Sequence, residues 1–104
     1  VLILASGNMV HNLRMFSFRD PTPLAWAEQC DLELRGFIEG QNQVALMAYG
    51  TGNDRERLAV PTPEHFYPLL YAIALQGPDE KAEFFNARVT GTISMTSVLI
   101  GGTA

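Results

Sequence analysis

The stretch PTPEHFYPLLY, Pro61–Tyr71, contains one of only two histidines in the 104-residue chain. It predicts a helix that begins at Thr62, because a threonine hydroxyl can accept a hydrogen bond from a free backbone N–H of the first turn. We expect this helix to run to about Gln76, with either a kink or a new start at Pro68, which has no backbone N–H to donate. In both cases His65 lies near the amino-terminal end of a helix, where the helix dipole favours the neutral imidazole that can bind a metal ion.

The other histidine follows a short apolar run at the start of the chain. Val1–Ala5 (VLILA) is continuous in apolar residues, as strands of a doubly covered parallel sheet are, and Ser6–Asn8 interrupts it. Ligands collect at the carboxyl ends of strands in α/β sheets, so His11 is the second candidate site residue. Because a natural amino terminus rarely begins on a core strand, we expect this sequence to be the C-terminal part of a longer protein, or to need a partner over its first strand.

Helical patterns fill the middle of the chain, and its last quarter is strand-like. The helix expected from about Pro23 to Glu39 has an apolar stripe and a charged side, the latter formed by Glu28, Asp31, Glu33 and Arg35. The segments expected after it are a short helix at Gln41–Tyr49, an exposed loop at Thr51–Leu58, an ambiguous stretch at Phe84–Val89 and a β-branched strand at Gly91–Ile100. Together with the strand expected at Val1–Ala5, these segments are consistent with an α/β fold, and the length of 104 residues suits one single or partial domain.

The net charge and the cysteine count exclude several classes of protein. The formal net charge is −4 and the seven basic residues are scattered, which argues against a nucleic-acid partner, because phosphate contacts need clustered lysine and arginine. The single cysteine, Cys30, excludes an internal disulfide and fits a reducing, cytoplasmic setting. No apolar run approaches the ~20 residues that span a bilayer, and no basic residues precede Val1–Ala5 as they would in a signal peptide, so we expect no membrane partner.

Each histidine also has an ordinary interpretation. A histidine at a helix start, such as His65, commonly bonds a loop carbonyl, and a loop histidine such as His11 commonly lies at the surface. A tight metal site needs about three protein ligands, and carboxylates are the remaining donors here. Glu64 is a poor co-ligand, because its side chain points about 100° away from that of His65 around a helix. On the residues alone, the metal site is incomplete.

Cys30 and Ser6 are two candidate nucleophiles with weak support. Cys30 falls on the apolar stripe of a predicted helix, beside Glu28 and Asp31, whereas a reactive thiolate needs a histidine or positive charge. A buried small hydrophobe is therefore the simpler interpretation of this cysteine. Ser6 lacks the G-x-S-x-G signature of a nucleophile elbow. A metal-independent hydrolase that uses Ser6 or Cys30 is accordingly our third hypothesis.

Three blocks of the sequence resemble a known family. They are SGNMVHNL (residues 6–13), PTPEHFYPLLYAIA (residues 61–74) and GTISMTSVLIGG (residues 91–102). In this order they resemble the C-terminal portion of the class III extradiol ring-cleavage dioxygenases, in the LigB-like superfamily and nearest to the 4,5-DOPA dioxygenase type. The resemblance implies that this chain is the C-terminal part of a mixed central sheet that is flanked by helices.

The resemblance also implies a cofactor, two substrates and roles for both histidines. The family holds a non-haem Fe(II), or zinc in its place, and uses O2 to open the ring of a catechol next to its diol. His65 then corresponds to a metal ligand. His11 corresponds to a catalytic pocket histidine that acts as acid and base, or to an additional ligand. A histidine that takes a catechol proton and later returns it needs a pKa near the working pH.

The remaining metal-binding histidines of the family lie in an N-terminal half that this sequence does not contain. We therefore expect the chain to carry half an active site and to be inactive alone. The missing half, or other copies in a homo-oligomer, would complete it. The alternative is a non-enzymatic binding or scaffold module of the same fold that kept the histidines without the metal, and metal content would separate the two.

Overall fold

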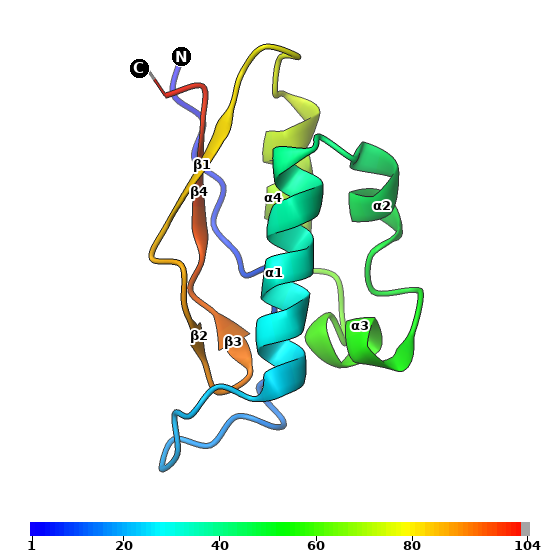
Figure 1. Cartoon of the computed structure of the whole chain (residues 1–104), viewed down its shortest axis with the longest axis vertical. Coiled ribbons are helices and arrows are strands. Elements are labelled where there is room, and N and C mark those ends of the chain that lie inside the picture. The colour runs from blue at the N-terminus through cyan, green and yellow to red at the C-terminus, as the bar shows by residue number, and fades with distance from the viewer. Residues whose placement is uncertain (103–104) are drawn as a thin grey trace.

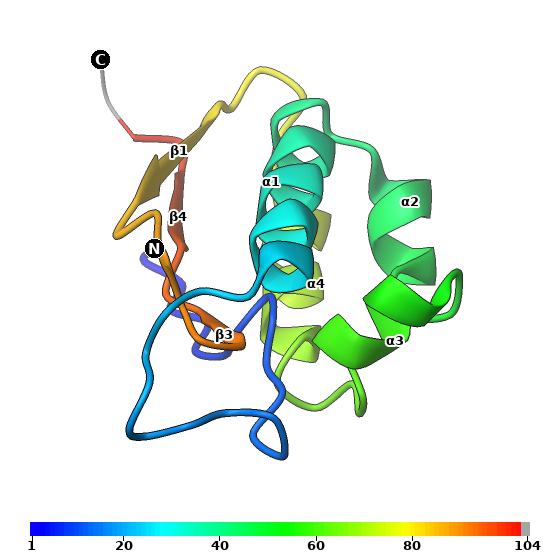
Figure 2. The same ribbon diagram turned by 60° about the horizontal axis from the view of Figure 1, so that its bottom comes forward.

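The computed structural model of the chain describes residues 1–102, with the helices on one side and the strands on the other (Figure 1, Figure 2). The helices are α1 (Ala25–Glu39), α2 (Gln43–Ala48), α3 (Asp54–Ala59) and α4 (Tyr67–Ala74). The strands are β1 (Ala82–Phe85), β2 (Val89–Thr90), β3 (Ile93–Ser94) and β4 (Ser97–Ile100). The predicted combination of helices and strands is confirmed. Of the helices within residues 1–102, none combines the length and the apolar character needed to cross a membrane.

The strands form two small antiparallel sheets. β1 pairs with β4, so that Ala82 lies opposite Ile100, and β2 pairs with β3. The mixed central sheet that we expected is therefore not formed by the described residues. The single strand expected at Gly91–Ile100 is also wrong in part, because this stretch contains two strands, β3 and β4. Between them the chain passes from one sheet to the other, and the backbone N–H of Met95 donates to the Arg88 carbonyl (2.8 Å).

The first five residues, Val1–Ala5, do not form the predicted strand. Leu2 and Leu4 are 80% and 86% exposed, and within residues 1–102 the backbone of residues 1–7 makes no hydrogen bond to another backbone group. The segment runs beside β4, and the two line a common groove (Figure 1). A strand needs a neighbouring strand to pair with its backbone groups, and β4 pairs with β1 instead.

Two helices begin later than their sequence signals indicated. α4 begins at Tyr67, five residues after Thr62, and residues 61–66 form bends and a turn. The alternative of a new start at Pro68 is close to what is observed, because Pro68 occupies the first turn, where no N–H partner is required. α1 begins at Ala25, two residues after the predicted start at Pro23, and its N-cap Leu24 makes no side-chain hydrogen bond, while its end at Glu39 is as predicted.

The segment Thr51–Leu58, expected to be a loop, contains all of α3 except its last residue, Ala59. The side chain of Asn53 accepts a hydrogen bond from Glu56 N (2.9 Å) and caps the helix. Asp54 and Glu56 then place negative charge in its first turn, where the helix dipole stabilises it. The polar composition of this segment predicted a loop, but its cap and its charges stabilise a short helix.

Helix α1 lies at the centre of the molecule, with helices α2 and α3 on one side and the strands on the other (Figure 2). Its buried face consists of Ala27, Cys30, Asp31, Leu34 and Ile38. The predicted burial of Cys30 is confirmed. Asp31, which we expected on the charged, solvated side, is only 2% exposed, so that prediction is wrong.

Candidate functional site

The two histidines, which lie far apart in the sequence, are stacked on one another. The ring centroids of His11 and His65 are 3.9 Å apart, and the ring planes are inclined by 22°. His11 is half-buried, whereas His65 is exposed. The tertiary structure thus joins the two candidate site residues in one place.

His11 lies in the segment of residues 8–12, which passes between β3 and the end of α3. The N–H of His11 donates to the Ala59 carbonyl (2.8 Å), and on the other side His11 forms an isolated antiparallel bridge with Ile93. The neighbouring Val10 carbonyl accepts from Ser94 N (2.9 Å). Hydrogen bonds on both sides therefore hold the backbone that carries His11.

His65 lies in the turn before α4, and the segment that follows Ser6 holds its backbone. The N–H of Asn8 donates to the His65 carbonyl (2.8 Å). Gly7 allows this approach, because a Cβ at Gly7 would overlap the same carbonyl oxygen. The block that contains His11 and the block that contains His65 are therefore joined through their backbones as well as through their rings.

The environment of His11 favours its neutral form. Burial lowers the pKa of His11 below its ordinary value, the nearby imidazole of His65 lowers it further, and a backbone hydrogen bond opposes both effects. A neutral imidazole has a lone pair that can accept a proton. His11 is therefore suited to accept a proton from a group that approaches the pair.

The stacking of the two rings limits how the two histidines could bind one metal ion. The lone pairs of an imidazole lie in its ring plane, so two rings inclined by 22° with centroids 3.9 Å apart hold their lone pairs in two nearly parallel planes, one above the other. Two ligands of one ion must instead converge on a point about 2.0–2.1 Å from each nitrogen. The pair therefore fits one histidine as a ligand with the other beside it, rather than both on one ion.

The described residues do not assemble a full metal site around this pair. Within residues 1–102 no group of three His, Cys, Asp or Glu side chains is placed to hold a metal ion. Glu64, which the sequence suggested as a poor co-ligand, is fully exposed, and its pKa is lowered chiefly by a hydrogen bond with Thr62. A site with three protein ligands would need donors in addition to those of these residues.

The two candidate nucleophiles are not part of this site. The Cys30 thiol is buried in the core, 3.7 Å from the Arg55 carbonyl, and burial raises its pKa, with Tyr49 as a neighbour. The Ser6 side chain is exposed and makes no hydrogen bond within residues 1–102. Neither side chain has the histidine partner that activates a nucleophile.

Sequence reasoning missed two residues behind the site, Asp31 and Ser94. The Ser94 hydroxyl donates to the buried carboxylate of Asp31, and the backbone of Ser94 bonds to the segment that carries His11. A signal was available, because Asp31 lies four residues after Ala27 and three before Leu34, which is the spacing of one helix face. A carboxylate at such a position indicates a buried polar partner.

A groove extends from His65 along α4 and β4. It encloses about 590 Å³, and its walls include the N-terminal segment Val1–Ala5 together with the apolar side chains of Leu69, Leu75 and Val98. His65 is thus exposed at one end of an apolar groove rather than on open surface.

Comparisons with known proteins agree with the resemblance of the three blocks. No family model matches the chain. It is 34% identical over 105 residues to a protein of Escherichia coli (strain K12) named 4,5-DOPA dioxygenase extradiol, an alignment that covers 97% of this chain and 39% of that protein. It is 31% identical over 93 residues to a protein of the same name from Beta vulgaris, with 89% of this chain and 35% of that protein covered.

A solved structure is similar as well. The crystal structure of the uncharacterized protein JW3007 from Escherichia coli K12 matches with a TM-score of 0.71 and 30% identity, over 89% of this chain and 40% of that one. The chain therefore spans well under half the length of each of these relatives. Together with the two histidine blocks, these matches show that the chain is a homologue of the 4,5-DOPA extradiol dioxygenases.

Proposed function

We propose that this chain is part of an extradiol dioxygenase that inserts O2 next to the diol of a catechol-type, DOPA-like substrate at a non-haem Fe(II), with Zn(II) as the alternative ion. The observation that carries the proposal is the stacking of His11 and His65, 3.9 Å apart, from two sequence blocks that resemble the family. The names of the relatives support the same reaction class. With this function we propose the LigB-like fold and, given the single buried cysteine, a cytoplasmic location.

We assign the two histidines different roles. We assign His65 as the metal ligand, because its side chain is exposed and lines the groove. The near-parallel rings disfavour His11 as a second ligand of the same ion. When bound, the ion supplies orientation of both substrates and withdrawal of charge from the catecholate.

We assign His11 the role of accepting and returning the catechol proton. Its lowered pKa keeps the imidazole neutral near neutral pH, so it can accept the proton of a catechol hydroxyl that lies beside His65. Its half-buried position keeps the ring at a fixed place next to His65, where it can later return the proton. A general base placed in this way typically contributes about 10²–10⁴-fold to the rate.

We further propose that this chain supplies only part of the site. The described residues offer one metal ligand and one proton acceptor, and the relatives are more than twice as long as this chain. The other ligands then come from the remaining part of the protein or from another copy, and the 104-residue chain alone does not turn over a catechol.

A chimera with the Escherichia coli relative tests this function. Residues 1–104 replace the matching segment of that relative, and O2 uptake with DOPA is measured after loading with Fe(II) without air. We expect turnover by the chimera, loss of bound iron in His65→Ala, and retention of iron with at least about a 100-fold loss of turnover in His11→Gln. Asp79→Ala, which removes an exposed carboxylate far from the pair in sequence, is the control for adventitious metal binding.

The alternative function gives a different result in the same experiment. A folded chimera that binds no iron, or whose O2 uptake is unchanged by both histidine substitutions, would favour a non-enzymatic binding or scaffold module. The isolated chain is measured in parallel. Turnover of DOPA by this chain alone would contradict the proposal that its site is incomplete.

A further inference from the structure

We propose that Asp31 is a positioning residue for the histidine pair, acting through Ser94; this inference rests on the proposed function of the pair. Asp31 lies on the buried face of α1 and is 2% exposed. Its Oδ1 atom accepts a hydrogen bond from the Ser94 hydroxyl, which is itself 1% exposed. The contact joins the central helix to β3 inside the core.

Ser94 in turn holds the segment that carries His11. The N–H of Ser94 donates to the Val10 carbonyl (2.9 Å), and its carbonyl accepts from Asn8 Nδ2 (2.9 Å). Val10 directly precedes His11, and Ile93, directly before Ser94, forms the bridge to His11. The position of Ser94 thus sets the position of the His11 backbone.

The same network reaches His65. Asn8 donates its side-chain amide to Ser94 and its backbone N–H to the His65 carbonyl (2.8 Å). We therefore expect a shift of Ser94 to change how the two rings stack. Val10, which bonds to Ser94, directly precedes His11, and Asn8, which also bonds to Ser94, donates to the His65 carbonyl. Asp31, Ser94 and Asn8 form one continuous set of hydrogen bonds behind the site.

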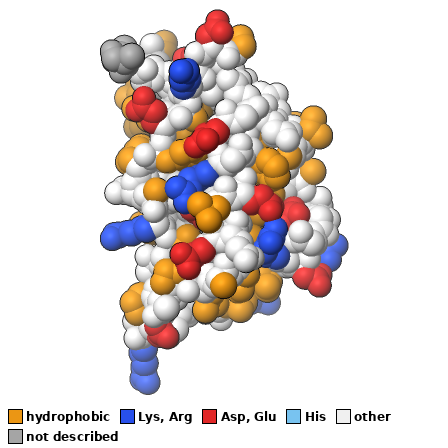
Figure 3. Space-filling view, in the orientation of Figure 1, with side chains coloured by type: hydrophobic (Ala, Val, Ile, Leu, Met, Phe, Trp, Pro, Cys, Tyr) orange, Lys and Arg blue, Asp and Glu red, His pale blue; other side chains and the backbone are white. Residues whose placement is uncertain are grey.

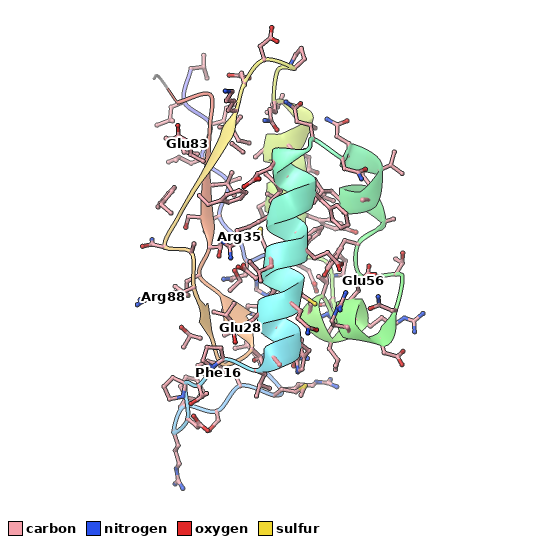
Figure 4. All side chains as sticks on the ribbon, viewed as in Figure 1. Phe16, Glu28, Arg35, Glu56, Glu83 and Arg88 are labelled. Atoms are coloured by element: carbon pink, nitrogen blue, oxygen red, sulfur yellow. The ribbon has the colours of Figure 1, made fainter. Side chains whose placement is uncertain are left out.

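The choice of a carboxylate at position 31 supports a positioning role. Burial of a carboxylate is costly unless it is paired and hydrogen-bonded, and the flanking positions on this face are apolar. Arg35 Nε lies 3.2 Å from Asp31 Oδ2, and Arg35 is on the side of α1 that faces the strands (Figure 4). An apolar residue would fill the same space without this cost, but it would not fix the direction of the Ser94 hydroxyl.

The histidine ring protons report on this network without any metal or substrate. Imidazoles stacked face to face shift each other's ring protons upfield in an NMR spectrum, and all spectra are recorded at one fixed pH. We expect Asp31→Ala and Ser94→Ala to lose this upfield displacement at both histidines. Asp31→Asn keeps an acceptor for the serine hydroxyl and should retain most of it.

Glu33→Ala is the matched control. Glu33 lies on the same helix and forms an ion pair with Arg55 (2.6 Å), but it makes no contact with Ser94 within the described residues. We expect it to leave the histidine shifts unchanged. If a folded Asp31→Ala or Ser94→Ala chain keeps wild-type histidine shifts, Asp31 only fills the core and the proposal is wrong.

A second variant covers the case in which Asp31→Ala does not fold. Ser94→Ala removes one hydroxyl and leaves the Ser94 backbone bonds possible, so its spectrum decides the question by itself, and Ser94→Thr should restore the shifts. Because this readout needs no iron, it is independent of the chimera experiment. Failure of the dioxygenase proposal would appear as lost turnover or lost iron in the chimera, and failure of the role of Asp31 would appear as unchanged histidine shifts, so the two failures are distinguishable.

Discussion

Gly7 and Gly36 differ in what surrounds them, and they lead to opposite predictions. A Cβ at Gly7 would overlap the His65 carbonyl oxygen, whereas nothing lies within 4 Å of a Cβ at Gly36 in α1. We expect Gly7→Ala to lower the free energy of unfolding by about 1–3 kcal/mol, because overpacking forces backbone segments apart. Gly36→Ala should raise it by about 0.5–1 kcal/mol, since alanine is the better helix former.

Urea unfolding followed by circular dichroism measures both changes, and Gly36→Ala serves as the control for the added methyl group. A Gly7→Ala chain as stable as the wild type would contradict the close packing of the Ser6–Asn8 segment on His65.

Cys30 and Tyr49 predict a loss of stability at alkaline pH. Burial is the main cause that raises the pKa of both side chains. The unfolded chain releases the thiol proton near pH ~8.5 and the phenol proton near pH ~10, while the folded chain keeps both. Above these values the folded state binds more protons, so the free energy of unfolding falls as pH rises, by at most about 1.4 kcal/mol per pH unit for each group.

The profile is obtained from urea unfolding at a series of pH values. Cys30→Ala should remove the first part of the decline and Tyr49→Phe the second. Tyr71→Phe changes a tyrosine that is 72% exposed, so it should leave the profile as it is. A wild-type profile that is flat across the thiol range would show that Cys30 is not buried in solution.

At the scale of elements, α3 demonstrates that capping can outweigh polar composition. Asn53 caps α3, whereas Thr62 caps no helix, because the N-cap of α4 is Phe66. We expect Asn53→Ala to lower the free energy of unfolding by about 1 kcal/mol, the usual cost of a lost cap. Thr62→Ala should change it by less than about 0.5 kcal/mol, as exposed substitutions usually do.

Chemical denaturation of the two variants beside the wild type compares the helices directly. An equal loss in both variants, or a larger loss in Thr62→Ala, would mean that α4 begins at Thr62 in solution, as the sequence signal indicated.

The positions of α1 and α2 were predicted more accurately than the start of α4. The end of α1 at Glu39 and the place of α2 were predicted from the spacing of apolar residues. The start of α4 at Tyr67 was not predicted. A helix that began at Thr62 would place Pro68 in its interior, where proline has no N–H for the backbone hydrogen bond. Local patterns therefore located the helices better than they located their first residues.

At the scale of the whole molecule, the apolar groove predicts self-association. Leu2 and Leu4 are 80% and 86% exposed beside β4, and Leu99 on β4 is 46% exposed. Figure 3 shows that charged side chains of both signs and hydrophobic ones share the face that carries α1. In contrast to that mixed face, exposed apolar residues that line one groove commonly mark an interface. We expect the isolated chain to sediment above the mass of one copy.

The matched substitutions lie on two different surfaces. Leu2→Lys with Leu4→Lys should return the chain to the mass of one copy. Val44→Lys with Met47→Lys changes two equally exposed apolar residues of α2, away from the groove, and should not. A wild-type chain that sediments as one copy at about 100 μM, a concentration that favours even weak association, would contradict the prediction.

The candidate site was only partly visible in the sequence. Both histidines were identified, since each follows a break in a regular pattern and each lies in a block that resembles the family. Their stacking and the burial of Asp31 were not predicted, because each depends on residues that are distant in the chain. The helical spacing of Asp31 was the one local sign of its burial.

The sequence by itself determined what local physics controls. Apolar periodicity set the positions of α1 and α2, the composition excluded an internal disulfide, and the sequence blocks indicated the family. Only the tertiary structure decided which strands pair, that Val1–Ala5 stays unpaired, and that His11 meets His65. The reason is that a helix satisfies its backbone within a few residues, whereas a strand and a site need partners from elsewhere in the chain.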